Sequence, residues 1–148
     1  MITRTGSAHR AAGYVWVFLL DLLGRLMIAL LFLWSGVFGI VLGWPSAPDM
    51  IARRGLPAPT LLGLAAGAVE LLAPIALFIP RLEVWAALVL AGYCIATAVL
   101  FHDYWMLEEP ARLQQMFHFM KNIALAGALL VIVARSDARS RVGRVEGI

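Results

Sequence analysis

Residues 61–79 read LLGLAAGAVELLAPIALFI, an apolar run that contains a single charged residue, Glu70. The run is close to the roughly 20 residues that an α-helix needs to cross the hydrocarbon core of a bilayer. Three further runs of this kind lie around it, at residues 22–42, 84–101 and 116–134. The sequence therefore predicts an all-α membrane protein built as a bundle of four transmembrane helices.

The composition agrees with this prediction and excludes several other classes of protein. Of the 148 residues, 62% are apolar and 14% are charged, and the mean hydropathy is +0.87. Such an excess cannot be buried in one soluble core, because a chain of about 150 residues leaves about a third of its unfolded-state surface in water. A single cysteine, Cys94, excludes a disulfide scaffold and is interpreted as a small packing residue. The basic residues are scattered at the ends of the apolar runs, which argues against a nucleic-acid partner.

The charges also predict how the chain crosses the membrane. We expect a short tail at residues 1–13, a membrane domain at 14–134 and a basic tail at 135–148. The first apolar run is longer than that of a cleaved signal peptide, so it is predicted to remain as an anchor. With the termini on one side, that side carries eight of the 12 basic residues. The positive-inside rule then places both termini in the cytoplasm and the protein in the bacterial inner membrane.

Two longer connections face the outside in this topology. Residues 45–60 contain four prolines and are predicted to form a turn-rich lid at the membrane interface, without a regular element. In residues 102–115, the acidic pair Glu108 and Glu109 precedes Pro110, a combination that favours a helix start. The fourth helix is therefore expected to begin at Pro110.

Small residues predict how the four helices pack, because association in lipid depends on close backbone approach. The predicted packing positions are Gly39, Gly43, Gly63, Gly67, Ala87, Ala91, Ala98, Ala124, Gly127 and Ala128. At about 100° per residue, the charged groups of the spans share faces with these positions. The charged side chains are thus predicted to point into the bundle.

Glu70 is the most informative of these charged residues, since it lies near the middle of its span. A charge at that depth costs about 2.5–3.5 kcal/mol even on a lenient scale, so it needs an ionic partner, water or a proton. Arg25 and Lys121 are the candidate partners, although Arg25 also has Asp21 four residues before it. Two interpretations stay open: Glu70 is a buried proton carrier, or it forms a structural pair that fixes the helix register.

A second polar group is expected at the outer end of the bundle. His102, His118, Lys121 and Asn122, with Trp105 nearby, offer hydrogen-bond donors beside apolar surface. This combination suits a quinone head group, whose carbonyl oxygens need donors and whose ring needs an apolar slot. A small anion, a hydrated helix end and a haem held by the two histidines are the alternatives. No metal site is predicted, since paired Glu-x-x-His motifs do not occur.

The motifs FHDYW at 101–105 and FMKNIALAGALL at 119–130, with LWSG at 33–36 and the pair Glu70-Leu71, form an ordered set. Together they resemble the DoxX-like family of membrane proteins over about residues 22–134. The resemblance implies a four-helix integral membrane fold. It also implies that Arg25, Glu70, His102, Lys121 and Asn122 match the family's recurring polar residues. One departure is Gly39, where the family often carries a basic residue.

The resemblance further implies a function, since some relatives look like subunits of thiosulfate:quinone oxidoreductases and others belong to complexes that counter oxidative stress. We therefore expect a subunit of a quinone-linked or oxidative-stress-related membrane oxidoreductase complex. Its expected partners are membrane lipid, a quinone, and either other proteins of the complex or a second copy of the chain. The alternatives are a non-catalytic assembly or anchor subunit and a small transporter, the latter disfavoured because no broken helix pair is evident.

Overall fold

The protein is a bundle of long helices in the computed structural model, which describes residues 3–146 and the side chains of residues 13–136. The elements are α1 (Thr3–Trp34), the π-helix η1 (Ser35–Val41), α2 (Ser46–Arg53), α3 (Pro59–Ala76), α4 (Glu83–Phe101), the 3-10 helix η2 (Tyr104–Met106) and α5 (Ala111–Glu146). Four stretches are long and apolar enough to cross a membrane, namely Gly13–Val41, Pro59–Ala76, Glu83–Met106 and Ala111–Ser136. No strand occurs in residues 3–146. The predicted all-α architecture with four spans is confirmed.

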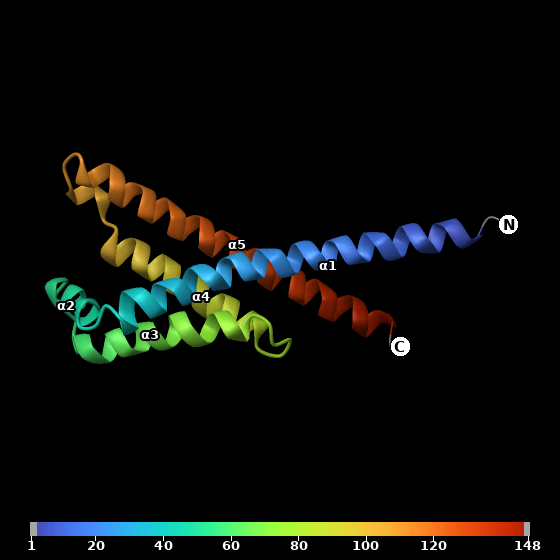
Figure 1. Cartoon of the computed structure of the whole chain (residues 1–148), viewed down its shortest axis with the longest axis horizontal. Helices are drawn as coiled ribbons and strands as arrows, with labels where there is room; N and C mark the ends of the chain where they lie inside the picture. The colour runs from blue at the N-terminus through green and yellow to red at the C-terminus, as the bar shows by residue number, and fades with distance from the viewer. Residues whose placement is uncertain (1–2, 147–148) are drawn as a thin grey trace.

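The two ends of the bundle differ (Figure 1). Both termini lie at one end, where α1 and α5 extend beyond α3 and α4. The short helix α2 and the turn between α4 and α5 lie at the other end, which we call the α2 end. Helices α1 and α5 continue through the described parts of the predicted tails. The cytoplasmic placement of the termini stays a prediction.

The connection at residues 45–60 was expected to lack regular structure, and this expectation is wrong. Residues Ser46–Arg53 form α2, with Asp49 in its first turn. The helix ends where Gly55 adopts a left-handed conformation (φ 69°), which glycine accepts without steric strain. The amides of Gly55 and Leu56 then donate to the carbonyls of Ala52 and Ile51, a Schellman ending. The acidic first turn and the terminal glycine were the signals of a helix among the prolines.

Small residues bring α3 against the end of the first span, as predicted for Gly63 and Gly67 of α3. The prediction for Gly39 is wrong, because that residue is exposed and Gly36 makes the contact instead. Gly63 and Gly67 are buried, and a Cβ atom on Gly67 would lie 3.1 Å from Cγ2 of Ile40 in η1. On the other side, a Cβ atom on Gly36 would lie 2.9 Å from Cδ2 of Leu71. The π-helical bond from the Leu42 amide to the Val37 carbonyl (2.8 Å) widens the turn at this contact.

The predicted packing stripe holds for α4 and is wrong for α5. Ala87, Ala91 and Ala98 are buried, whereas Ala124, Gly127 and Ala128 are exposed. The face of α5 that packs on its neighbours instead carries Ala126, Leu129 and Ile132. Larger side chains suffice there because α5 packs beside the alanine-rich face of α4, which leaves room for them.

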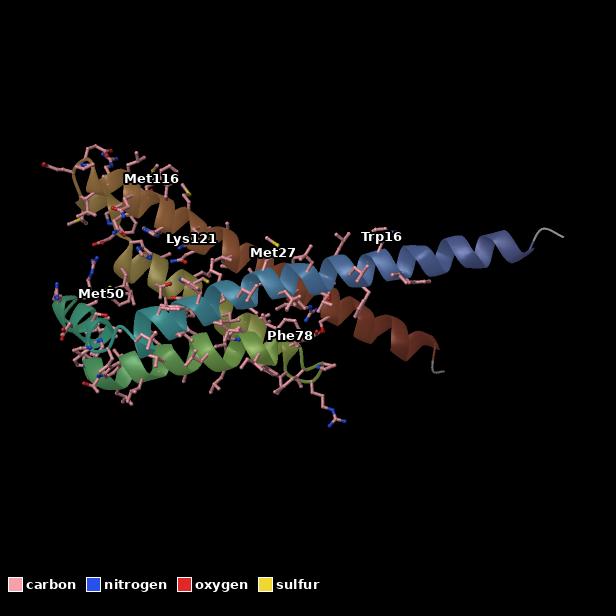
Figure 2. The ribbon with its side chains drawn as sticks, viewed as in Figure 1. Trp16, Met27, Met50, Phe78, Met116 and Lys121 are labelled. Carbon is pink, nitrogen blue, oxygen red and sulfur yellow. The ribbon has the colours of Figure 1, made fainter. Side chains whose placement is uncertain are left out.

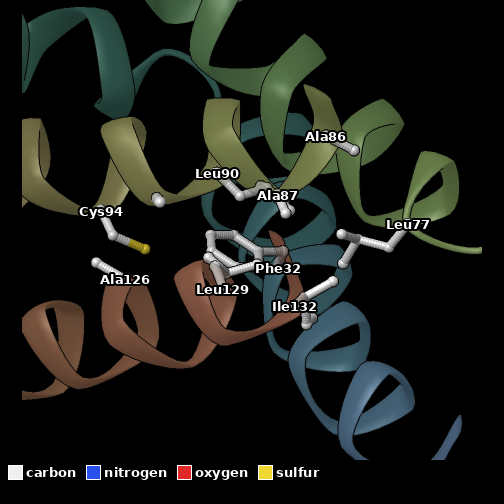
Figure 3. Close-up of a cluster of buried hydrophobic side chains, with 10 residues drawn as sticks. Phe32, Leu77, Ala86, Ala87, Leu90, Cys94, Ala126, Leu129 and Ile132 are labelled. Atoms are coloured by element: carbon white, nitrogen blue, oxygen red, sulfur yellow. The ribbon is translucent and has the colours of Figure 1, made fainter. Parts of the chain in front are cut away.

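A hydrophobic core fills the middle of the bundle (Figure 3). Phe32 from α1 and Leu90 from α4 meet Leu129 and Ile132 from α5, with Leu77 from the end of α3 beside them. Leu77, Leu90 and Leu129 have no exposed surface. This core separates the polar side chains of the bundle into two groups, one toward each end.

Candidate functional site

A cavity of about 580 Å³ lies at the α2 end, between η1, α2, α3, α4 and α5. Its walls are largely apolar and include Phe32, Phe38 and Ile51, together with Met50 of α2, which Figure 2 labels along with Lys121 of α5. The polar side chains that line it are Ser35, Glu70, Tyr93, Thr97, His102, His118, Lys121 and Asn122. The structure thus brings Glu70 into one cavity with four of the residues predicted for the outer polar group.

The deep end of the cavity holds Glu70. The residue is 7% exposed, and Oε1 accepts a hydrogen bond of 2.6 Å from the Tyr93 hydroxyl. Oε2 is buried and has no hydrogen-bond partner among the side chains that the structure describes. Among the described residues, neither Arg25 nor Lys121 forms an ion pair with Glu70. The predicted cationic partner is therefore wrong, and the partner is the phenol of Tyr93. The signal for Tyr93 was its hydroxyl in mid-span, since a buried tyrosine usually finds a polar partner.

Thr97 and Asn122 lie in the middle of the cavity wall. The amide nitrogen Nδ2 of Asn122 donates to Oγ1 of Thr97 at 3.4 Å, and the same hydroxyl lies 2.9 Å from the carbonyl of Tyr93. Cys94 lines the cavity as well and is buried in the core, as expected of a packing residue. Polar groups therefore continue from Glu70 along α4 toward the α2 end.

The two histidines lie at the outer part of the cavity. Nδ1 of His102 is 2.7 Å from Oε1 of Gln115, and the His102 and His118 rings stack with centroids 5.2 Å apart and planes at 21°. Axial ligation needs a nitrogen of each ring to point at one iron. Stacked rings present their faces to each other instead, so the arrangement does not fit a haem between them.

Trp105 was predicted to join this group, and the structure does not place it there. The residue is 51% exposed, and its ring packs edge-on against Tyr104 and Phe119, with ring centroids 5.2 and 5.8 Å away. The cause is η2, which follows the end of α4 and turns Trp105 away from the cavity toward the outer surface of α5.

An ion pair joins α2 to the end of α4 beside the cavity. The guanidinium of Arg54 donates to both carboxylate oxygens of Asp103, at 2.6 and 2.8 Å, and to the Phe101 carbonyl at 3.3 Å. The hydrogen bond with Asp103 raises the pKa of Arg54 above its ordinary value. Because α2 also supplies Met50 and Ile51 to the cavity wall, this pair holds one wall against another.

The second polar group lies beyond the core, toward the termini, and is centred on Arg25. The guanidinium donates from Nε to Asp21 at 2.9 Å, and from Nη1 to Glu83 and to the Leu77 carbonyl, both at 2.7 Å. Arg135 lies 3.4 Å from Asp21. The predicted Arg25–Asp21 pair is confirmed, but Glu83 was missed. Its signal was an acid at the start of a span, at the same end of the bundle as Arg25.

Comparisons with known proteins agree with this architecture. The DoxX family profile matches residues 20–103, more than half of the chain. The chain belongs to the DoxX family. The matched range includes Arg25, Glu70 and His102, whereas Lys121 and Asn122 lie beyond it.

A curated relative supports the location of this DoxX protein. The chain is 30% identical over 111 residues to "Inner membrane protein YphA" of Escherichia coli (strain K12), covering 75% of this chain and 79% of the relative. No solved structure matches the chain. With four spans and this relative, the chain is a multi-pass protein of the bacterial inner membrane.

Proposed function

We propose that this DoxX protein is the membrane subunit of a quinone-linked or oxidative-stress-related oxidoreductase complex, and that its cavity receives the quinone head group. The observation that carries the proposal is the convergence of Glu70, His102, His118, Lys121 and Asn122 on one largely apolar cavity. Its volume of about 580 Å³ is that of an ordinary small-molecule site.

The side chains present fit a quinone. The Lys121 ammonium and the Asn122 amide supply donors for carbonyl oxygens, and the aromatic wall of Phe32 and Phe38 suits the ring. Oε2 of Glu70 is buried without a partner at the deep end, which is where a carboxyl group can hold a proton for the reaction. A bound quinone would supply two-electron redox chemistry, with electrons from a partner subunit that carries a redox centre.

The test is quinone retention in protein purified in mild detergent. We expect Glu70→Gln and His102→Ala to lose bound quinone or quinone-dependent activity while insertion into the membrane stays intact. Arg81→Ala is the matched control, because Arg81 is exposed in the turn between α3 and α4, away from the cavity. Unchanged retention and activity in both cavity variants would refute the proposal.

A non-catalytic anchor or assembly subunit is the second candidate, and the Arg25 cluster favours it. This cluster ties α1, α4, α5 and the end of α3 together and needs no ligand to do so. An anchor role predicts that the cavity variants keep their co-purifying partner and their cellular phenotype. A redox role predicts that the partner stays bound while quinone is lost.

A further inference from the structure

The polar side chains of the cavity form a series that leads from Glu70 toward the α2 end. Tyr93 and Thr97 are four residues apart on one face of α4, and His102 follows at the end of that helix. Asn122 and Lys121 face them from α5, and Asn122 is bonded to Thr97. A cavity of this size with several polar partners meets the conditions for holding water. Hydrogen-bonding groups therefore extend from Glu70 to the outer part of the cavity.

The series stops on the other side of Glu70. On α4, Ala87 and Leu90 lie between Tyr93 and Glu83, and on α5, Leu129 and Ile132 lie between Asn122 and Arg135. Phe32 closes the same layer from α1, as Figure 3 shows. Apolar, closely packed interiors of this kind hold no water. The Arg25 cluster is thus separated from Glu70 by a dry layer to which α1, α4 and α5 contribute.

We propose that Glu70 exchanges protons with water at the α2 end of the bundle only, along Tyr93, Thr97 and Asn122. The Tyr93 hydroxyl occupies Oε1 of Glu70, which leaves Oε2, buried and without a partner among the described side chains, as the oxygen that holds the proton. With the termini in the cytoplasm, as the arginines predict, this water is periplasmic.

The reaction that uses the proton rests on the proposed function. Reduction of a quinone to a quinol takes two electrons and two protons. The electrons come from the redox partner subunit, and each proton that Glu70 gives to a quinone oxygen is replaced from the α2 end. Oxidation of a quinol reverses both movements, so its protons leave at the same end.

The route is tested by the access of water-soluble thiol reagents, which requires no quinone. In a Cys94→Ala background, Thr97→Cys and Asn122→Cys place single reporters in the cavity from two different helices. Arg53→Cys and Arg81→Cys are exposed references for the two ends of the bundle. A charged, membrane-impermeant methanethiosulfonate is applied to sealed vesicles of each orientation.

We expect both cavity reporters to react about a hundredfold faster when the reagent is on the side of the membrane that carries Arg53 (the Arg53 face) than when it is on the side that carries Arg81 (the Arg81 face). This factor corresponds to the free-energy cost of bringing the charged reagent through the apolar layer. Faster reaction from the Arg81 face, equal reaction from both faces, or no reaction from either would overturn the proposal. If the reporters behave as expected but the protein retains no quinone, the proposed function fails and the one-sided route stands.

Discussion

Removal of the Arg25 side chain tests what holds the four spans in register. The residue is 5% exposed and lies inside the first span, and its guanidinium makes hydrogen bonds to two carboxylates and one carbonyl, each at 2.7–2.9 Å. Breaking a buried ion pair by deleting one partner costs about 3–5 kcal/mol, because the remaining charge stays buried. Arg25→Ala should therefore lower the free energy of unfolding by about 3–5 kcal/mol.

The control is the neighbouring cation of the same cluster. Arg135 is half-exposed and lies 3.4 Å from Asp21, so Arg135→Ala should cost at most about 1 kcal/mol. Arg25→Lys should fall between the two, since an ammonium keeps the charge but lacks the planar fork that reaches both Asp21 and Glu83.

The measurement is thermal unfolding of each variant in the same mild detergent. Unfolding is monitored as the loss of monodisperse protein with temperature. We expect the midpoint temperature to be highest for Arg135→Ala, lower for Arg25→Lys and lowest for Arg25→Ala. If Arg25→Ala unfolds at the same temperature as the unmodified protein, the cluster is not what holds the helices in register.

Three further outcomes are expected. Gly36→Ala should cost about 1–3 kcal/mol in the same unfolding assay, because a Cβ atom there would lie 2.9 Å from Leu71, whereas Gly127→Ala meets nothing within 4 Å and should be neutral. Arg54→Ala should speed proteolytic cleavage in residues 45–60 about fivefold, because loss of its ion pair with Asp103 costs about 1 kcal/mol, whereas Arg53→Ala should not. Equal cleavage rates in the two variants would show that this ion pair does not hold α2 against α4. A reporter fused to the C-terminus should show cytoplasmic activity, and a periplasmic reading would overturn the arginine argument.

The spans and the inward direction of the charged side chains could be predicted, because both depend on periodicity along a single helix. Run length fixes which segments cross the bilayer, and the helical repeat fixes which residues of one span share a face. The angles indicated that Glu70 and His102 point into the bundle, but the sequence placed them in two separate polar groups, and it is the structure that brings them into one cavity. The end of α4 was harder, since η2 reverses the direction of Trp105, and no helical angle applies beyond the last turn.

The contacts between helices could not be predicted in the same way. Which residue faces Glu70 depends on how α4 is rotated and shifted along its axis relative to α3. The sequence pattern of a single helix determines neither the rotation nor the shift. Tyr93 also lies within an apolar run and is counted among the apolar residues, although its hydroxyl donates a hydrogen bond to Glu70. The π-helix η1 could not be predicted either. Its hydrogen bonds join residues five apart instead of four, and this change leaves the pattern of apolar residues in the sequence unchanged.

The separation of the two polar groups explains why one acid has a cationic partner and the other does not. Arg25 contacts Glu83 and Leu77, where α4 begins and α3 ends, and there a buried pair with several hydrogen bonds offsets the loss of water. An arginine beside Glu70 would satisfy that carboxylate equally well, but it would also hold it permanently charged and fill the cavity. A phenol leaves one oxygen free and carries no charge. Because Tyr93 and not an arginine lies beside Glu70, Oε2 of this carboxyl group has no partner among the described side chains, which is what the proposed proton exchange requires.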